Sequence, residues 1–171
     1  MSMGADPRGF RGIRPATTRW LSFLAVGAYV IILDQLTKDL VRTVLEPGQG
    51  VHVAGSLWIQ AFTNPGIAGG AFAGDAVPAA LVATISVLGI LLFLVRHGAV
   101  GRSVTIGFGL LIGGGIGNLL DRLRAGYVTD FIVHGNQAFN LADVAILTGT
   151  AIILAGLCVR LLRSQLGLFA R

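Results

Sequence analysis

The segment GYVTDFIVHGNQAFNLADVAIL, residues 126–147, carries two aspartates, Asp130 and Asp143, next to an apolar run of membrane-spanning character. Two carboxylates held close together in a partly dry site cannot both ionise easily, so one keeps a proton near neutral pH and the pair titrates as a unit. The ionised member can take a proton from water while the other polarises a carbonyl group. This chemistry needs no serine, cysteine or histidine nucleophile, and the three histidines form no motif with a serine or a cysteine.

Both acids also have a purely structural interpretation. Asn140 suits the N-cap of a helix, and Asp143 then takes the third helical position, where an acid stabilises a helix start. Asp130 could be a solvated loop acid. The local sequence leaves these alternatives open.

Two further charge clusters have the same ambiguity. Asp121 and Arg122 look like a charge cluster at a helix end, in which Asp121 could pair with a nearby arginine. Asp34 and Lys38 are four residues apart, the spacing of an intrahelical ion pair. In a membrane helix, however, such charges also indicate a functional site.

The composition indicates an integral membrane protein. Of the 171 residues, 54% are hydrophobic and 12% are charged, which is too apolar for an ordinary soluble domain. The net charge of +5 does not predict nucleic-acid binding, because the arginines gather at the ends of apolar runs. The single cysteine, Cys158, allows no intrachain disulfide and does not support a cysteine-based metal site.

Four apolar segments are each close to the length of a bilayer span. They predict an all-α integral membrane fold with four transmembrane helices and a small extracytoplasmic β-rich loop region. We expect one membrane domain, 1–171, with helices at about 20–40, 76–95, 103–121 and 141–162. The first segment lacks a convincing signal-peptide cleavage site, so we expect it to be retained.

The arginines predict the orientation in the membrane. They gather in the tail 1–19, in the short loop near 96–102 and in the C-terminal tail 163–171, which an even number of spans puts on one side. The positive-inside rule makes that side cytoplasmic. The outer loops are then 41–75 and 122–140, and seven of the eight acids lie toward that outer side.

Two local patterns bear on the architecture. The stretch VHVAGSLWIQAFTN in the first outer loop is rich in β-branched and aromatic residues, so we expect short strands there. Gly109, Gly113 and Gly117 recur at four-residue spacing, which lets membrane helices approach closely. We interpret these glycines as packing residues that bring Asn118 near the neighbouring helices.

Three motifs together resemble the lipoprotein signal peptidase family, also called signal peptidase II. They are DQLTK at 34–38, GNLLDRLRAGYVTDFI at 117–132 and FNLADVAI at 139–146. Their order and spacing match the family, and the resemblance covers roughly residues 20–162.

The resemblance implies an aspartic endopeptidase of the bacterial inner membrane, with several spans, both termini in the cytoplasm and its active site near the extracytoplasmic face. Its substrates would be prolipoproteins whose lipobox cysteine carries diacylglyceryl, cut immediately before that cysteine. The family's catalytic aspartates fall on Asp130 and Asp143. We expect no metal, no cofactor and no nucleic-acid partner. The resemblance implies that the partners are the substrate and membrane lipids, and four helices with one site suggest that a monomer suffices.

The family's polar support residues also have counterparts in this chain. They fall on Asp34, Lys38, Asn64, Asn118, Asp121, Arg122 and Asn140, and the family's glycine after the asparagine falls on Gly66. The chain departs from the family pattern in FTNPGIAGGAF, where extra glycines displace the aromatic Phe72. This difference suggests a locally altered substrate cradle.

Three other functions compete with this interpretation. A metal-dependent lipid phosphotransferase could use several aspartates to hold magnesium, although no compact aspartate motif lies within one helix. A proton-coupled transporter or channel could use the acids as a relay, although they crowd one end of the helices. A non-enzymatic assembly factor would need packing alone.

Overall fold

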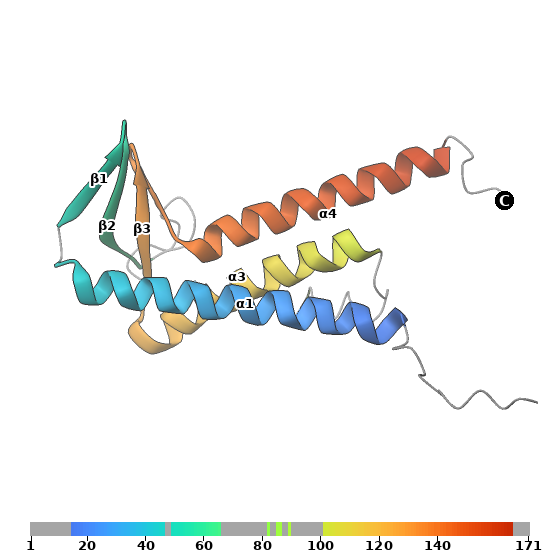
Figure 1. Ribbon diagram of the computed structural model, residues 1–171, viewed down its shortest axis with the longest axis horizontal. Coiled ribbons are helices and arrows are strands. Elements are labelled where there is room, and N and C mark those ends of the chain that lie inside the picture. Colours follow the sequence, from blue (N-terminus) through green and yellow to red (C-terminus); the bar gives the residue numbers. More distant parts are fainter. Residues whose placement is uncertain are drawn as a thin grey trace, which may run out of the picture.

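The computed structural model describes residues 15–46, 49–65 and 101–165, together with the single positions 82, 85, 86 and 89. In chain order these residues form three long helices and four strands: α1 (Pro15–Val44), β1 (Gly50–Ala54), β2 (Leu57–Asn64), α3 (Arg102–Ala125), β3 (Val128–His134), β4 (Gln137–Phe139) and α4 (Leu141–Gln165). Figure 1 shows the helices side by side, with the sheet at one end of them.

Within the described part of the chain, three helices are long and apolar enough to cross a membrane. They correspond to the predicted spans near 20–40, 103–121 and 141–162. The predicted span 76–95 lies outside the described residues, apart from the four single positions. The all-α label is not confirmed, because a four-stranded sheet accompanies the helices.

Glycines let α3 lie close to both of its neighbours. A Cβ atom on Gly113 would lie 2.7 Å from the carbonyl oxygen of Gly27 on α1, and one on Gly107 would lie 2.9 Å from that of Gly149 on α4. A Cβ on Gly117 would lie 2.7 Å from the Asp34 carboxylate. A larger side chain at these positions would push the helices apart, so the packing interpretation of the glycines is confirmed.

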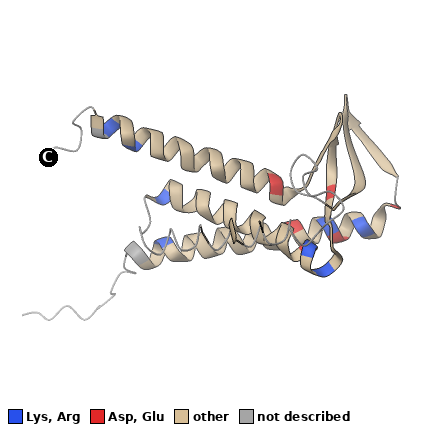
Figure 2. Cartoon of the chain, turned by 180° about the vertical axis from the view of Figure 1, so that it is seen from behind, with Lys and Arg blue, Asp and Glu red and all other residues tan. Residues whose placement is uncertain are grey.

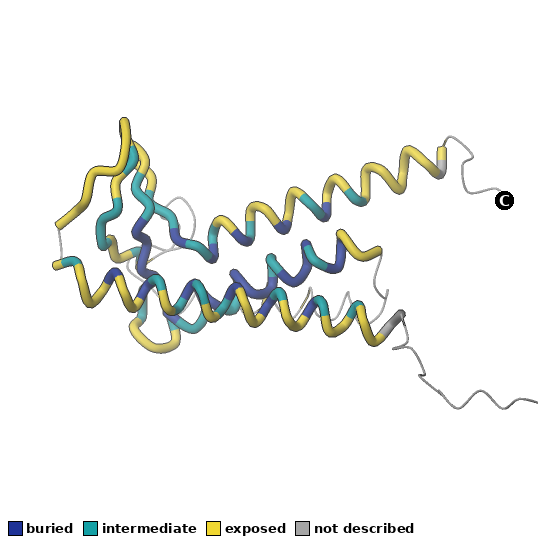
Figure 3. Tube along the Cα trace, viewed as in Figure 1, coloured by how far each residue is buried: buried dark blue, intermediate teal, exposed yellow. Residues whose placement is uncertain are grey.

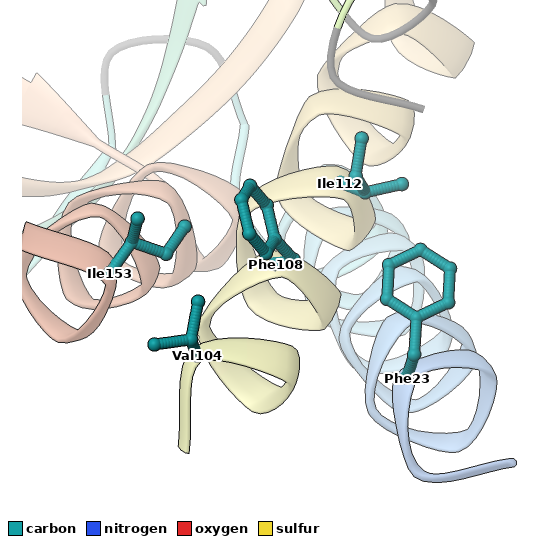
Figure 4. Packing of buried hydrophobic residues seen from close by; sticks show 5 residues of the cluster. All are labelled: Phe23, Val104, Phe108, Ile112 and Ile153. Carbon is teal, nitrogen blue, oxygen red and sulfur yellow. The ribbon is translucent and has the colours of Figure 1, made fainter. Parts of the chain in front are cut away.

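Because α3 packs against both α1 and α4, it is the most buried of the three helices. Figure 3 shows α3 buried along much of its length, whereas α1 and α4 each expose a continuous face. The buried apolar cluster in Figure 4 joins all three helices. It consists of Phe23 on α1, Val104, Phe108 and Ile112 on α3, and Ile153 on α4. In a bilayer such a cluster holds helices together by close van der Waals packing, because lipid tails are as apolar as the side chains.

The strands form one antiparallel sheet in the order β1-β2-β3-β4. Gly55 (φ 54°) and Gly135 (φ 59°) supply the left-handed backbone at the two tight turns. β1 and β2 confirm the strands predicted between 41 and 75. β3 and β4, in contrast, lie within the segment 122–140, for which we made no strand prediction.

The end of α3 determines where β3 begins. The helix continues past the predicted end at 121 to Ala125, and Gly126 caps it in the left-handed conformation (φ 80°) with its N–H bonded to the Arg122 carbonyl oxygen. β3 starts at Val128, directly after this cap. The short connection holds the first residues of β3 against the helices.

The described acidic residues gather at one end of the molecule, whereas basic residues lie at both ends. The start of α1, the start of α3 and the end of α4 lie at the same end of the molecule, away from the sheet (Figure 1). Arg19, Arg102 and Arg163 belong to these helix ends. Figure 2 shows the described acidic residues gathered at the opposite end, beside the sheet. Lys38, Arg42 and Arg122 also lie at this end, so the orientation in the membrane stays a prediction.

Candidate active site

Asp130 and Asp143 come from different elements. Asp130 lies in β3 and is 1% exposed, so the alternative of a solvated loop acid is wrong. Asp143 lies in the first turn of α4 and is partly buried. Its backbone N–H donates to the Asn140 side-chain oxygen (2.9 Å), while the Asn140 N–H donates to Asp143 Oδ2 (3.2 Å). The predicted helix cap is therefore present as a reciprocal capping box.

The same asparagine connects the two carboxylates. Asn140 Nδ2 donates to Asp130 Oδ1 (2.6 Å) and to Asn118 Oδ1 (3.1 Å). Asn118 Nδ2 in turn donates to Asp143 Oδ1 (2.8 Å). Asn64, at the end of β2, donates to the other oxygen of Asp130 (3.0 Å). Capping and site formation are thus two roles of one residue, and the structural interpretation does not exclude the functional one.

Lys38 fixes the orientation of this amide chain. Its side chain is fully buried, and Nζ donates to Asp34 Oδ2 (2.7 Å) and to Asn118 Oδ1 (2.9 Å) and pairs with Asp121 Oδ2 (3.1 Å). Because an ammonium group donates only, it selects the oxygen side of the Asn118 amide, which turns the NH₂ group toward Asp143. The predicted Asp34–Lys38 ion pair exists, but it forms part of a network that spans two helices.

Asp34 and Asp121 both accept from backbone amides as well. Asp34 Oδ1 accepts the N–H of Ala142 (2.9 Å), one of the amides that a helix start leaves unsatisfied. Asp121 Oδ2 accepts the N–H of Thr129 (3.2 Å), the residue before Asp130. The two buried carboxylates therefore tie the start of α4 and the start of β3 to the helices beneath them.

Three residues of this network were not singled out from the sequence. Gln35 Nε2 (3.2 Å) and Arg42 Nη2 (3.1 Å) contact Asp121 Oδ1, and Arg42 Nε donates to Thr129 Oγ1 (2.7 Å). Gln35 lies inside the DQLTK motif and Thr129 inside the 117–132 motif, but the roles of Arg42 and Thr129 depend on tertiary contacts. No local signal in the sequence marks them.

The electrostatic environment of Asp130 favours its protonated form. Burial raises the pKa of Asp130 from 3.8 to about 6, and the Asp143 charge adds to the rise. The hydrogen bonds from Asn64 and Asn140 and the charge of Lys38 oppose it. With this pKa, Asp130 can both hold and release a proton close to neutral pH.

The remaining predicted positions are also placed or accounted for. Arg122 Nη1 donates to the Asn118 carbonyl oxygen (3.2 Å), on the same face of α3. Gly66 and Phe72 lie outside the described residues, so the glycine-rich departure is not described. Among residues 15–46, 49–65 and 101–165, no three His, Cys, Asp or Glu side chains converge as metal ligands.

Comparison with known proteins identifies the family. The family model described as signal peptidase (SPase) II matches residues 26–159. The chain belongs to the signal peptidase II family. The lipoprotein signal peptidase of Moorella thermoacetica is 37% identical over 136 residues, covering 78% of this chain and 90% of that one. The lipoprotein signal peptidase of Azoarcus sp. is 36% identical over 151 residues, covering 84% and 86%.

Two solved structures share the fold of this chain over most of its length. A bacterial membrane enzyme superposes with a TM-score of 0.74 at 26% identity, covering 80% of this chain and 87% of that one. A second bacterial membrane enzyme gives a TM-score of 0.72 at 26% identity, with coverages of 80% and 92%. The resemblance drawn from the three sequence motifs is confirmed: the chain is a multi-pass membrane peptidase of the signal peptidase II family.

Proposed function

We propose that this protein is an aspartic endopeptidase that removes the signal peptide of bacterial prolipoproteins, cutting immediately before the diacylglyceryl-modified lipobox cysteine. Membership of the signal peptidase II family and relatives named lipoprotein signal peptidase support the substrate class. The observation that carries the mechanism is the pair Asp130 and Asp143, linked through Asn140 and Asn118.

In this mechanism the two carboxylates share one proton. The ionised carboxylate takes a proton from a water molecule, whose oxygen attacks the scissile carbonyl carbon, while the protonated carboxylate donates to the carbonyl oxygen. The tetrahedral intermediate then collapses. One of its hydroxyl protons returns to the pair as the C–N bond breaks, and the amine of the cysteine residue leaves with the other proton of the pair. One water is consumed, and the pair returns to its starting protonation state.

The surrounding amides keep the pair rigid during these steps. Each oxygen of Asp130 accepts from an asparagine, and each oxygen of Asp143 accepts from Asn118 or from the Asn140 backbone. Fixed donors of this kind position the carboxylates without the reorganisation that bulk water would need. Neither carboxylate then has to find its orientation after the substrate arrives.

We further propose the topology that suits a lipid-anchored substrate. The chain would form one domain with four transmembrane helices, both termini in the cytoplasm of a bacterium and the site near the outer face of the inner membrane, and a monomer would suffice. The sheet at one end of the helices would lie at the membrane surface. The diacyl chains of the substrate could remain in the bilayer while the scissile bond reaches the aspartates, which supplies much of the positioning.

The test is cleavage of a purified diacylglyceryl-modified prolipoprotein, followed as a gel shift, with and without a chelator. The same precursor without its lipid is the matched substrate. Wild type should cleave the lipidated precursor in the presence of chelator, and Asp130→Asn and Asp143→Asn should not. Asp39→Asn, which removes an exposed acid on α1, is the control and should cleave normally. Loss of cleavage with chelator, or equal cleavage of the unlipidated precursor, would overturn the proposal.

A further inference from the structure

Thr129, at the start of β3, is hydrogen-bonded to side chains of both α1 and α3. β4 pairs with residues 132–134, so it does not cover the edge of β3 at Thr129. The Asp121 carboxylate from α3 lies there instead and accepts the Thr129 N–H (3.2 Å). Within the described part of the chain, this strand edge is thus bonded by a side chain from a helix rather than by another strand.

Arg42 of α1 completes the attachment. Its Nε donates to the Thr129 hydroxyl (2.7 Å), its Nη2 pairs with Asp121 Oδ1 (3.1 Å) and its Nη1 pairs with Asp39 (3.0 Å). The planar guanidinium presents these donors in a fixed fork, so it joins α1, α3 and β3 in one geometry. Thr129 is 3% exposed, which leaves its hydroxyl little freedom to choose another partner.

This attachment lies one residue from Asp130. The Asp130 carboxylate meets Asn140, whose position is set by α3 and α4, while its backbone belongs to the sheet. A movement of the sheet relative to the helices would therefore lengthen the 2.6 Å contact and change the position of Asp130 relative to Asp143. The contacts at Thr129 oppose such a movement.

We propose that Arg42 and Thr129 are positioning residues that set the place of Asp130 in the catalytic pair, acting through the Arg42–Thr129–Asp121 clamp. The role rests on the proposed function, because it concerns a reaction in which Asp130 takes part. The contacts of the clamp run to Asp121 rather than to the Asp130 or Asp143 carboxylate, so we expect it to affect the chemical step rather than substrate binding.

The sharpest test exchanges the Thr129 hydroxyl. Thr129→Val removes the hydroxyl at nearly constant volume and keeps the backbone N–H, whereas Thr129→Ser keeps the hydroxyl and loses the methyl group. We expect Thr129→Val to lower kcat by roughly ten- to a hundredfold with KM unchanged, and Thr129→Ser to recover most of that loss. A merely structural role would lower the melting temperature of both variants and would not separate them by the hydroxyl.

A double-variant comparison tests whether Arg42 acts through Thr129. Arg42→Met should lower kcat about as much as Thr129→Val, and the double variant should be no worse than either single variant. Asp39→Asn, which removes the exposed partner of the same guanidinium, should keep the wild-type kcat. Multiplying losses in the double variant, or an equal loss in Asp39→Asn, would overturn the proposal.

Hydrogen–deuterium exchange tests, independently of activity, whether the clamp holds the start of β3 in place. Exchange of the full-length protein in detergent should become faster for residues 128–131 in Thr129→Val and Arg42→Met, while peptides from α4 should keep the wild-type rate. Unchanged exchange at 128–131 would overturn the clamp even if kcat fell. If wild type cleaves no lipidated precursor, the proposed function fails, and the exchange rates still decide whether the clamp holds β3.

Discussion

Replacing Asp130 by asparagine should make the protein more stable relative to wild type as the pH rises. Burial raises the pKa of Asp130 to about 6, from 3.8 in the unfolded chain. The folded state therefore prefers the protonated acid. The contribution of Asp130 to stability is fully present below about pH 4 and is lost as the pH rises through about 6.

The size of the effect follows from the pKa difference. A shift of roughly two pH units corresponds to about 3 kcal/mol of stability lost between about pH 4 and pH 8. Asparagine stays neutral over that range and escapes this loss. Its NH₂ group would meet donors from Asn64 or Asn140, which costs about 1–3 kcal/mol but does not depend on pH. The variant-minus-wild-type difference should therefore start near or below zero and grow with pH.

The assay is thermal unfolding in one detergent, followed by tryptophan fluorescence from about pH 4 to pH 8. For a chain of this size, about 3 kcal/mol corresponds to a change in the melting-temperature difference of roughly 6–12 °C. Ser56→Ala, in the exposed β1–β2 turn, is the control and should follow the wild-type curve. A difference between Asp130→Asn and wild type that is constant or shrinks with rising pH would refute the reasoning.

Three further substitutions probe the helices and the amide chain. Lys38→Met should destabilise the protein by about 3–5 kcal/mol in thermal unfolding, because it leaves two buried carboxylates without their shared cation; wild-type stability would contradict the network. Gly113→Ala should lower the free energy of unfolding by about 1–3 kcal/mol, seen as a lower melting temperature, because its Cβ would press on a backbone carbonyl. The control Gly27→Ala has ordinary clearance and should be tolerated. Asn140→Ser keeps a cap acceptor but loses the donor to Asp130, so the cleavage assay should show kcat at least about tenfold lower with most of the stability retained; an unchanged kcat would argue against the amide chain.

Much of the helical part of the fold could be predicted from the sequence, because bilayer spans depend on long apolar runs. The predicted helices near 103–121 and 141–162 correspond to α3 and α4, although α3 extends to Ala125. That extension was missed because the charged turn after Asp121 looks like a helix end, whereas Gly126 is the residue that caps the helix. The β3–β4 hairpin was missed although Gly135 and Asn136 form a turn dipeptide between its strands, because β4 has only three residues and makes a weak strand pattern.

Some residues of the candidate site could be predicted from the sequence, and others could not. Asp130 and Asp143 could be proposed because their motifs lie close together in the sequence, and the structure links them through Asn140. Arg42 and Thr129 could not be proposed, because an arginine near the end of a helix and a threonine in a strand are ordinary in isolation. Their importance arises from contacts between residues 87 positions apart in the sequence.

The measurement that tests the central claim most directly is the kcat of Asp130→Asn, Asp143→Asn and the double variant on a lipidated prolipoprotein. Two residues that act as one unit give non-additive losses. If the two carboxylates form one catalytic pair, each single variant should fall to the same residual rate as the double variant, with the folded state retained. Substantial activity in either well-folded single variant, or losses that multiply in the double variant, would contradict the account.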